Sequence, residues 1–201
     1  MSTVSPPAES KPTIREQRKA ARRLELLDAA AELFAERGYA AVRLEDLGAA
    51  VGISGPAVYR HFPNKEAVLV ELLVDISDYL LTGGRRVVRN AANASGTISE
   101  LVDFHLDFAL SKPALIRIQD RDLANLPTSA RRNVRRKQRE YVEVWVLALR
   151  GYDPKLHEDD ARTKAHAVFG LLNSTPHSIG RSMSSRSREV LKEMADAALM
   201  A

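Results

Sequence analysis

Four side chains able to bind DNA lie close together in the first third of the sequence: Tyr59, Arg60, His61 and Lys65. The tyrosine hydroxyl, the histidine ring and the lysine ammonium can each donate a hydrogen bond to a phosphate oxygen. Such contacts fix the register of a protein on DNA without reading its sequence. An arginine side chain is suited to two parallel hydrogen bonds with guanine. We therefore expect Arg60 to read a base and the other three residues to contact phosphates.

Two short helices joined by a tight turn would position these donors within Val42–Lys65. The first helix has apolar residues at helical spacing, namely Leu44, Leu47 and Val51. Gly52 is expected to end this helix, because glycine readily adopts the left-handed angles that close a helix. Ser54 fits the N-cap of the second helix, and Pro56 fits its first turn, where a missing N–H is not needed. The pattern predicts a helix-turn-helix.

The second short helix is expected to have one side for the core and one side for DNA. Val58 and Phe62 would anchor it to the core. Its other side begins with three small residues that allow close approach to base pairs, namely Gly55, Pro56 and Ala57. The second helix of a helix-turn-helix enters the major groove. Double-stranded DNA is therefore the expected partner.

The spacing of these residues resembles the DNA-binding domain of the TetR family of transcriptional repressors. The residues that match are Leu47, Gly52, Ile53, Ser54, Val58, Tyr59, His61, Phe62, Lys65 and Glu66. The preceding segment from Leu27 to Tyr39 resembles the first helix of that family. The sequence departs from the family at Arg43, where threonine is frequent, and at Gly48, where alanine is frequent.

The resemblance implies a set of DNA contacts, an assembly and a ligand. The implied DNA contacts are Arg43, Gly55, Pro56, Tyr59, His61 and Lys65. The family binds DNA as a homodimer, and the last two helices are the natural dimer surface, packed as a four-helix bundle. Its C-terminal part holds a small-molecule pocket. The long helix that starts at Lys65 would link the two parts.

The composition limits the class of protein. The chain has 201 residues, is 45% hydrophobic and 28% charged, and carries a net charge of +4, as ordinary globular proteins do. It has no cysteine, which excludes disulfides and thiolate metal sites. It shows no apolar run of membrane-spanning length, no secretory signal, and no catalytic, metal or nucleotide motif. We expect a cytoplasmic protein that is not an enzyme and needs no cofactor.

Helical patterns fill the chain, and no strand-like alternation appears. We predict an all-α fold of about nine helices, with residues 1–13 as a disordered tail, 14–63 as the DNA-binding domain and 64–201 as the ligand-binding and dimerisation domain. The segment from Asn90 to Thr97 is expected to be a loop, with Thr97 and Glu100 forming a capping box after it. Gly83 and Gly84 are expected to end or weaken the helix before it. The last two helices are expected over 157–181, with a kink or break at Pro176, and over 187–200.

Two runs of positive charge allow more than one interpretation. Six Lys or Arg residues and one Glu lie between Lys11 and Arg23, and six Lys or Arg residues and no acid lie between Arg131 and Arg139. Either run can be a solvated surface, which is the usual case. The first adjoins the helix-turn-helix, so phosphate or minor-groove contact is favoured there.

The ligand site is expected among the C-terminal aromatic residues and the second basic run. The candidates are Phe104, Phe108, Arg135, Arg139, Tyr141, Trp145 and Phe169. Plain core is the alternative for the phenylalanines, whereas the polar tips of Tyr141 and Trp145 suit a half-apolar pocket. The segment around the basic run loosely resembles TetR-family regulators of fatty-acid and steroid breakdown, whose inducers are CoA thioesters. Arginine binds phosphate by paired hydrogen bonds.

The motifs, the composition and the family resemblance leave two candidate functions. The first is a homodimeric repressor that binds a palindromic operator and is released by a small molecule, possible inducers being lipids or CoA thioesters. The second is a DNA-binding module that has no inducer and is controlled by a protein partner. A filled core between Phe104 and Trp145 would favour the second.

Overall fold

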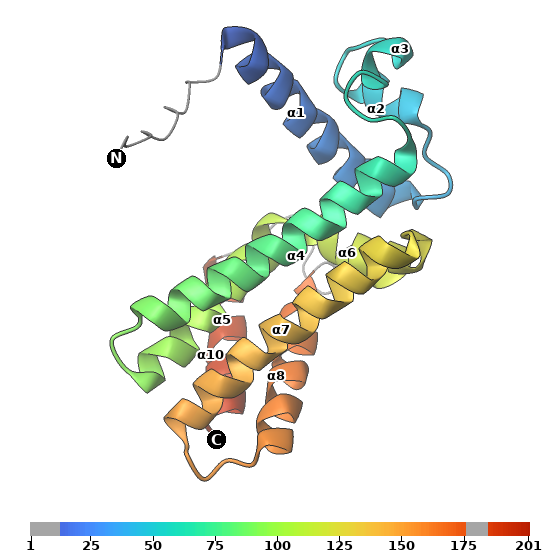
Figure 1. Ribbon diagram of the computed structural model, residues 1–201. Helices are drawn as coiled ribbons and strands as arrows, with labels where there is room; N and C mark the ends of the chain where they lie inside the picture. The colour runs from blue at the N-terminus through green and yellow to red at the C-terminus, as the bar shows by residue number, and fades with distance from the viewer. Residues whose placement is uncertain (1–12, 176–184) are drawn as a thin grey trace, which may run out of the picture.

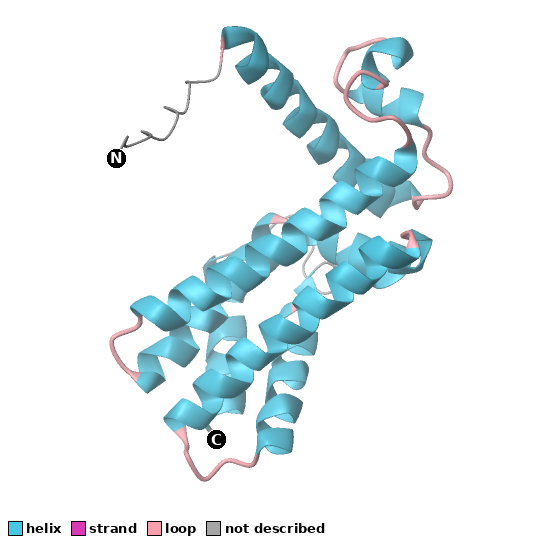
Figure 2. Cartoon of the chain, in the orientation of Figure 1, coloured by secondary structure: helices cyan, strands magenta, loops and turns pink. Residues whose placement is uncertain are grey.

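The structure is a computed structural model that describes residues 13–175 and 185–201. Every regular element in these two ranges is a helix, as Figure 2 shows. The nine α-helices of the described ranges are α1 (Ile14–Arg37), α2 (Leu44–Ala50), α3 (Gly55–Val58), α4 (Lys65–Asn90), α5 (Ala94–Ser111), α6 (Pro113–Asp122), α7 (Thr128–Tyr152), α8 (Glu158–Leu172) and α10 (Ser185–Met200). One 3-10 helix, Leu123–Asn125, follows α6. The predicted all-α fold is confirmed.

Helix α4 joins the two parts of the molecule. In Figure 1 the helices α1, α2 and α3 lie at one end, and α4 runs from them along the whole helical body. It packs against α1, α5, α6 and α7, and a single apolar cluster extends from α1 to α10. Helix α4 therefore contacts helices at both ends of the molecule.

The turn between α2 and α3 depends on two glycines. Gly52 has φ of 71°, in the left-handed region, and ends α2 as predicted. A Cβ on Gly48 would lie 2.7 Å from Cγ2 of Val58 and 2.9 Å from the backbone oxygen of Ile53. Glycine at 48, where the family often has alanine, thus matches an unusually close crossing of α2 and α3. Ser54 occupies the N-cap of α3 as expected, but its side chain makes no capping hydrogen bond.

Helix α1 is capped at both ends. The Thr13 hydroxyl accepts the Glu16 N–H at 3.3 Å, and the Glu16 carboxylate accepts the Thr13 N–H at 2.7 Å, forming a capping box. The last residue of the predicted tail is therefore part of the helix cap, while residues 1–12 lie outside the described residues. Gly38, with φ of 89°, closes the helix.

Gly83 and Gly84 do not end α4, which continues to Asn90. Both glycines are buried, and aromatic rings pack directly on the helix backbone there. A Cβ on Gly83 would lie 2.1 Å from Cζ of Phe104, and a Cβ on Gly84 would lie 2.6 Å from Cε2 of Tyr141. These glycines make room for the rings of α5 and α7.

The predicted capping box at Thr97 is wrong. Helix α5 begins at Ala94, and the Asn93 side chain caps it by accepting the Gly96 N–H at 2.8 Å. Thr97 is buried inside the helix, and its hydroxyl donates to the Asn93 backbone oxygen at 2.8 Å. Asparagine caps a helix as well as threonine does, so the earlier cap shortens the expected loop.

Helices α8 and α10 complete the body. Helix α8 ends at Leu172, earlier than predicted, and Pro176 lies outside the described residues. Helix α10 is tied to α5 by Lys192, which donates to Asp103 at 2.7 Å, and by Arg188, which donates to Asp107 at 2.6 Å. Over the described ranges, no helix is long and apolar enough to span a bilayer.

Candidate nucleic-acid interface and aromatic core

The outward side of α3 is open to solvent. Tyr59, just after the helix, is 52% exposed, and Pro56 and Arg60 are also exposed. Gly55 is half-buried. Val58 and Phe62 are fully buried, as predicted. The structure thus separates the predicted DNA-facing residues from the two core anchors.

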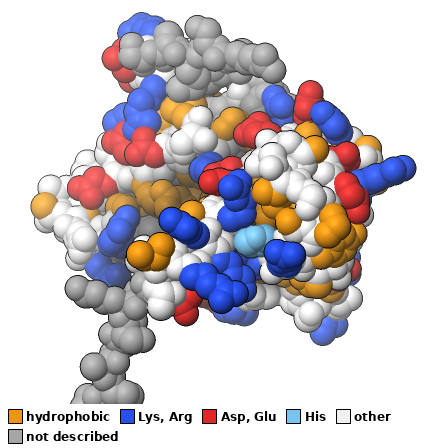
Figure 3. Space-filling model, turned by 90° about the horizontal axis from the view of Figure 1, so that it is seen from above, with side chains coloured by type: hydrophobic (Ala, Val, Ile, Leu, Met, Phe, Trp, Pro, Cys, Tyr) orange, Lys and Arg blue, Asp and Glu red, His pale blue; other side chains and the backbone are white. Residues whose placement is uncertain are grey.

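His61 lies within a cluster of positive charge. Burial lowers its pKa, and the charges of Lys19, Arg23, Arg22 and Arg60 lower it further. Its Nδ1 atom is buried and has no hydrogen-bond partner among the described residues. Figure 3 views this end of the molecule from above and shows Lys and Arg side chains gathered around a histidine. A phosphate group would be attracted to this cluster and would offer an acceptor.

The N-terminal basic run divides into two groups. Its outer residues are exposed on α1, namely Arg15, Arg18 and Lys19. The inner residues bind the protein itself. Arg22 donates to the Val51 oxygen at 3.1 Å. The Arg23 guanidinium donates to Glu71 of α4 at 2.7 Å and lies 4.0 Å from the centre of the Phe62 ring. Among the described residues of this run, the outer group is therefore better placed to reach DNA than Arg22 and Arg23.

Lys65 is surrounded by backbone oxygens. Its ammonium donates to the carbonyls of Tyr39, Ala40 and Val42 at 2.6, 3.2 and 2.7 Å, and it lies 4.4 Å from the centre of the Tyr39 ring. An ammonium has three donors, and these contacts use all of them. A phosphate would have to replace one of the carbonyls. In this arrangement Lys65 positions the loop between α1 and α2.

The first turn of α2 has two acidic residues, Glu45 and Asp46, whose contacts the sequence did not indicate. The Asp46 carboxylate accepts the Arg43 N–H at 2.7 Å, which satisfies the backbone donor at the start of α2 but does not replace the hydroxyl of a threonine cap. The exposed Arg43 side chain remains available. The Tyr59 hydroxyl donates to Glu45 at 3.2 Å, and this hydrogen bond raises the tyrosine pKa. Nothing in the spacing of Glu45 and Tyr59 indicated this pair.

Four of the predicted ligand residues of the C-terminal part lie together around His105, whereas Phe104 lies apart from them. Four aromatic rings surround His105, with ring-centre distances of 5.7 Å to Phe108, 5.9 Å to Tyr141, 6.1 Å to Trp145 and 5.0 Å to Phe169. We call these five residues the aromatic core. Phe104 instead packs on Gly83, with its ring 5.4 Å from that of Tyr79.

Polar atoms are buried at the centre of the aromatic core. His105 Nδ1 lies 3.2 Å from the Tyr141 hydroxyl, and its Nε2 lies 3.1 Å from the Asn173 side-chain oxygen. Burial lowers the pKa of His105 to about 4 and raises the pKa of Tyr141. The buried Trp145 N–H makes no hydrogen bond with any described residue. The cluster therefore offers a spare donor in an apolar setting.

The two predicted arginines do not join the aromatic core. Arg135 and Arg139 are exposed on α7, whereas Tyr141 and Trp145 lie on its buried face. His105 was missed by sequence reasoning, although it falls on the apolar stripe of its helix between Leu101 and Phe108. A histidine at such a position is buried and must find partners.

The buried His105 predicts a loss of stability in mild acid. Its pKa is about 4 in the folded protein and about 6.5 in an unfolded chain. The unfolded state therefore binds more protons between these values, and stability falls as the pH is lowered through this window. By pH 5 the loss relative to pH 7 should be about 2 kcal/mol. Urea unfolding of the wild type and of His105→Phe measures it, because the variant lacks this part of the pH dependence. Parallel pH profiles for the two proteins would contradict the prediction.

Family models match both parts of the chain. The model described as "Bacterial regulatory proteins, tetR family" matches residues 26–72, and the model described as "Tetracyclin repressor-like, C-terminal domain" matches residues 92–177. The first range covers α2, α3 and the exposed face described above. The second range contains all five residues of the aromatic core, whereas most of α4 lies between the two ranges.

Known proteins and solved structures agree with these matches. The HTH-type transcriptional repressor KstR2 of Rhodococcus jostii is 31% identical over 132 residues, which are 65% of either chain. KstR2 of Mycobacterium tuberculosis is 42% identical over 72 residues, which are 36% of either chain. A TetR-family regulator from Bordetella parapertussis has a TM-score of 0.80 at 25% identity, over 89% of this chain and 94% of its own. PfmR of Thermus thermophilus has the same fold, with a TM-score of 0.76 at 24% identity, over 88% of this chain and 97% of its own. The chain thus belongs to the TetR family of DNA-binding transcriptional regulators.

Proposed function

We propose that the protein is a ligand-responsive repressor that binds a palindromic operator as a homodimer and is released by a small molecule. The observation that carries the proposal is the polar centre of the aromatic core. His105, Tyr141 and Asn173 are hydrogen-bonded inside an apolar region, and the Trp145 indole N–H beside them lacks a partner among the described residues. Apolar sites with a few convergent polar groups are typical of small-molecule pockets.

In the proposed DNA interface some residues contact the DNA, and Lys65 positions a loop that does so. Arg60 reads a base, and Tyr59 and His61 donate to phosphates, the Tyr59 hydroxyl exchanging its exposed partner Glu45 for a phosphate oxygen. Arg43 adds a phosphate contact at the start of α2, and Gly55 and Pro56 let α3 approach closely. Lys65 acts by holding the loop before α2, because its ammonium already binds three carbonyl oxygens.

The proposed dimer uses the exposed faces of α8 and α10. Small or apolar residues are exposed on both helices, including Ala167 and Gly170 on α8 and Val190, Met194 and Ala197 on α10. Two such helices from each copy would form a four-helix bundle related by a two-fold axis. The two α3 helices would then meet successive major grooves of a palindrome.

Helices α4 and α6 would carry the response to the DNA-binding end. The Arg121 guanidinium of α6 donates to the Phe34 backbone oxygen, and to that of Ala35 at 3.4 Å, at the end of α1. Lys137 of α7 forms an ion pair with Asp78 of α4. A ligand that binds better to one arrangement of these helices would shift the population between two spacings of the α3 helices.

The inducer class is proposed as a lipid or a CoA thioester. The similarity to KstR2 repressors supports this direction, since the KstR2 of Mycobacterium tuberculosis with a solved structure is a ketosteroid transcriptional regulator. A ring system or acyl chain would enter the aromatic core. Arg135 and Arg139 lie outside that core, so they would meet only a charged group that extends to the α7 surface. We also propose a cytoplasmic location, and domains over 14–63 and 64–201.

The alternative, a DNA-binding module controlled by a protein partner, is favoured by one feature. The rings of the aromatic core pack closely, with the Trp145 and Phe169 centres 5.0 Å apart and the Tyr141 and Phe169 centres 5.5 Å apart. A ligand would have to displace them. A small-molecule screen therefore separates the two functions.

The test selects an operator from random duplex DNA and measures its release by small molecules. We expect a two-fold symmetric site, salt-sensitive binding, and raised thermal stability with one class of acyl-CoA or free acid. Ligands that stabilise the protein should also release the DNA. Selection of an asymmetric site, or binding that no small molecule changes, would favour the alternative.

The dimer surface has a matched pair of variants. Gly170 is exposed on α8, and apart from the adjacent residues and backbone of its own helix no described atom lies within 4 Å of a Cβ added there. Gly170→Arg is expected to leave the monomer folded but to place two charges against each other across the two-fold axis. Light scattering at micromolar concentration should then give monomers, with operator affinity lowered by at least about 100-fold through loss of the second half-site. Gly151→Arg, at a position equally open among the described residues, is the control and should stay dimeric. Monomeric wild-type protein would refute the assembly.

A further inference from the structure

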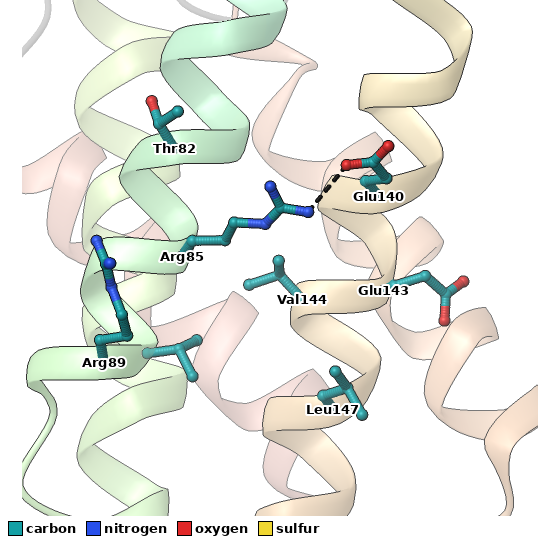
Figure 4. Close-up of a pocket in the computed structure, with 8 residues that line it drawn as sticks. Thr82, Arg85, Arg89, Glu140, Glu143, Val144 and Leu147 are labelled. Carbon is teal, nitrogen blue, oxygen red and sulfur yellow. Dashed lines mark hydrogen bonds and ion pairs between the residues drawn. The ribbon is translucent and has the colours of Figure 1, made fainter.

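A groove between α4 and α7 lies outside the aromatic core. It has a volume of about 550 Å³ and is lined by Thr82, Arg85, Val88, Arg89, Glu140, Glu143, Val144 and Leu147. Figure 4 shows Arg85 extending from α4 toward Glu140, with Val144 and Leu147 below this pair on α7. A volume of this size is enough for a drug-sized ligand.

The floor of the groove is apolar and open. Leu147 is 67% exposed and Val88 is 37% exposed, although both are large hydrophobic side chains. Val144 connects this floor to the aromatic core, because its Cγ1 lies 3.7 Å from a Cβ position on Gly84, against which the Tyr141 ring packs. An apolar body lying on Leu147 and Val88 would therefore be separated from the core by a single layer of side chains.

The charges around the groove favour an anion. The Glu140 carboxylate accepts from Arg85 at 2.9 Å and from Arg136 at 2.6 Å, and these contacts lower its pKa, that with Arg136 most strongly. Glu143 is paired with Arg162 from α8. Glu140 is thus shared between Arg85 in the groove and Arg136 outside it, Glu143 is paired from outside the groove, and the positive charge of Arg89 is left without an acidic partner among the described residues.

We propose that this groove binds a small amphipathic anion. Its apolar body lies on Val88, Val144 and Leu147, and its carboxylate or phosphate accepts hydrogen bonds from Arg85 and Arg89. The proposal rests on the ligand-responsive function above and assigns the anionic end of the ligand to α4 instead of to Arg135 and Arg139. Bound there, the ligand joins α4, which leads to the DNA-binding end, to α7.

The test uses decanoate and its uncharged analogue decanol as probes, with binding measured by equilibrium dialysis of the full chain. Wild-type protein should bind decanoate at least about tenfold more tightly than decanol, since hydrogen bonds to charged groups are strong. The double variant Arg85→Gln/Arg89→Gln should lose this preference, and its fold should persist because Glu140 keeps Arg136. The matched variant Arg135→Gln/Arg139→Gln should bind decanoate with an affinity within about twofold of the wild-type affinity.

A third variant locates the apolar body. Leu147→Glu changes an exposed side chain, so the fold should tolerate it, and its carboxylate in the groove should reduce decanoate binding by at least about tenfold. Equal binding of decanoate and decanol by wild type, absence of binding by wild type, or a loss confined to the Arg135→Gln/Arg139→Gln variant would overturn the proposal. Failure of the repressor function itself would appear separately, as wild-type protein that selects no DNA site.

Discussion

Replacing Arg60 with alanine is expected to remove base discrimination at two symmetry-related positions of the operator and to weaken operator binding by about 30-fold to 10⁴-fold. Each bidentate contact between arginine and guanine contributes about 1–3 kcal/mol, and a dimer makes the contact twice. Arg60 lies in the turn two residues after α3 and its side chain is exposed, so the substitution leaves the buried Val58 and Phe62 untouched. Fluorescence anisotropy with the selected operator, and with operators changed at each base pair, measures both effects.

Lys19 provides the control for this experiment. It is exposed on α1 close enough to His61 to lower the pKa of that residue, and it is expected to meet only the phosphate backbone. Lys19→Ala should weaken binding to all sequences alike and reduce the slope of log affinity against log salt by about one unit per half-site. If Arg60→Ala behaved in this uniform way, Arg60 would be a phosphate contact and the base reader would lie elsewhere.

Replacing Gly84 with valine is expected to lower the free energy of unfolding by about 3 kcal/mol or more, as overpacking of a filled core does. The first added carbon would lie 2.6 Å from Cε2 and 3.1 Å from Cδ2 of Tyr141. That ring cannot easily move away, because it is buried and its hydroxyl is 3.2 Å from His105 Nδ1. Urea unfolding at one protein concentration measures the change, since a dimer makes stability depend on concentration.

Gly151→Val is the matched control for this substitution. Gly151 also lies in a helix, the last turn of α7, but apart from the adjacent residues and backbone of that helix no described atom lies within 4 Å of a Cβ added there. The free energy of unfolding of Gly151→Val should stay within about 1 kcal/mol of the wild-type value, since the substitution changes only the helix propensity of that position. Equal stability of the two variants would show that the Tyr141 ring does not need the space above Gly84.

The central motif could be predicted from sequence because its signals are local. Gly52 closes α2, the apolar residues of α2 recur at helical spacing, and Val58 and Phe62 lie within one turn of each other. Each feature depends on backbone angles or on neighbours three or four residues away, which the sequence displays directly. The helical class and most helix bounds follow for the same reason. The error at Thr97 arose where two cap candidates, Asn93 and Thr97, stand four residues apart.

The roles of charged and polar side chains were decided by tertiary structure. Arg23 and Lys19 stand in one basic run, yet Arg23 is paired with Glu71, 48 positions away, and Lys19 remains exposed. His105 appeared isolated in the sequence, and its partners Tyr141 and Asn173 lie 36 and 68 positions away. Lys65 was expected to bind phosphate, whereas its ammonium binds carbonyls more than 20 positions earlier.

The sequence by itself determined the helical fold, the helix-turn-helix and the residues that face away from its core. Tertiary structure alone decided which cations remain free for DNA or ligand, which aromatic rings meet, and why Gly83 and Gly84 lie inside a continuous helix. The physical reason is the range of the interactions. Helix periodicity and capping act over a few residues, whereas ion pairs, ring packing and burial depend on which helices the fold brings together.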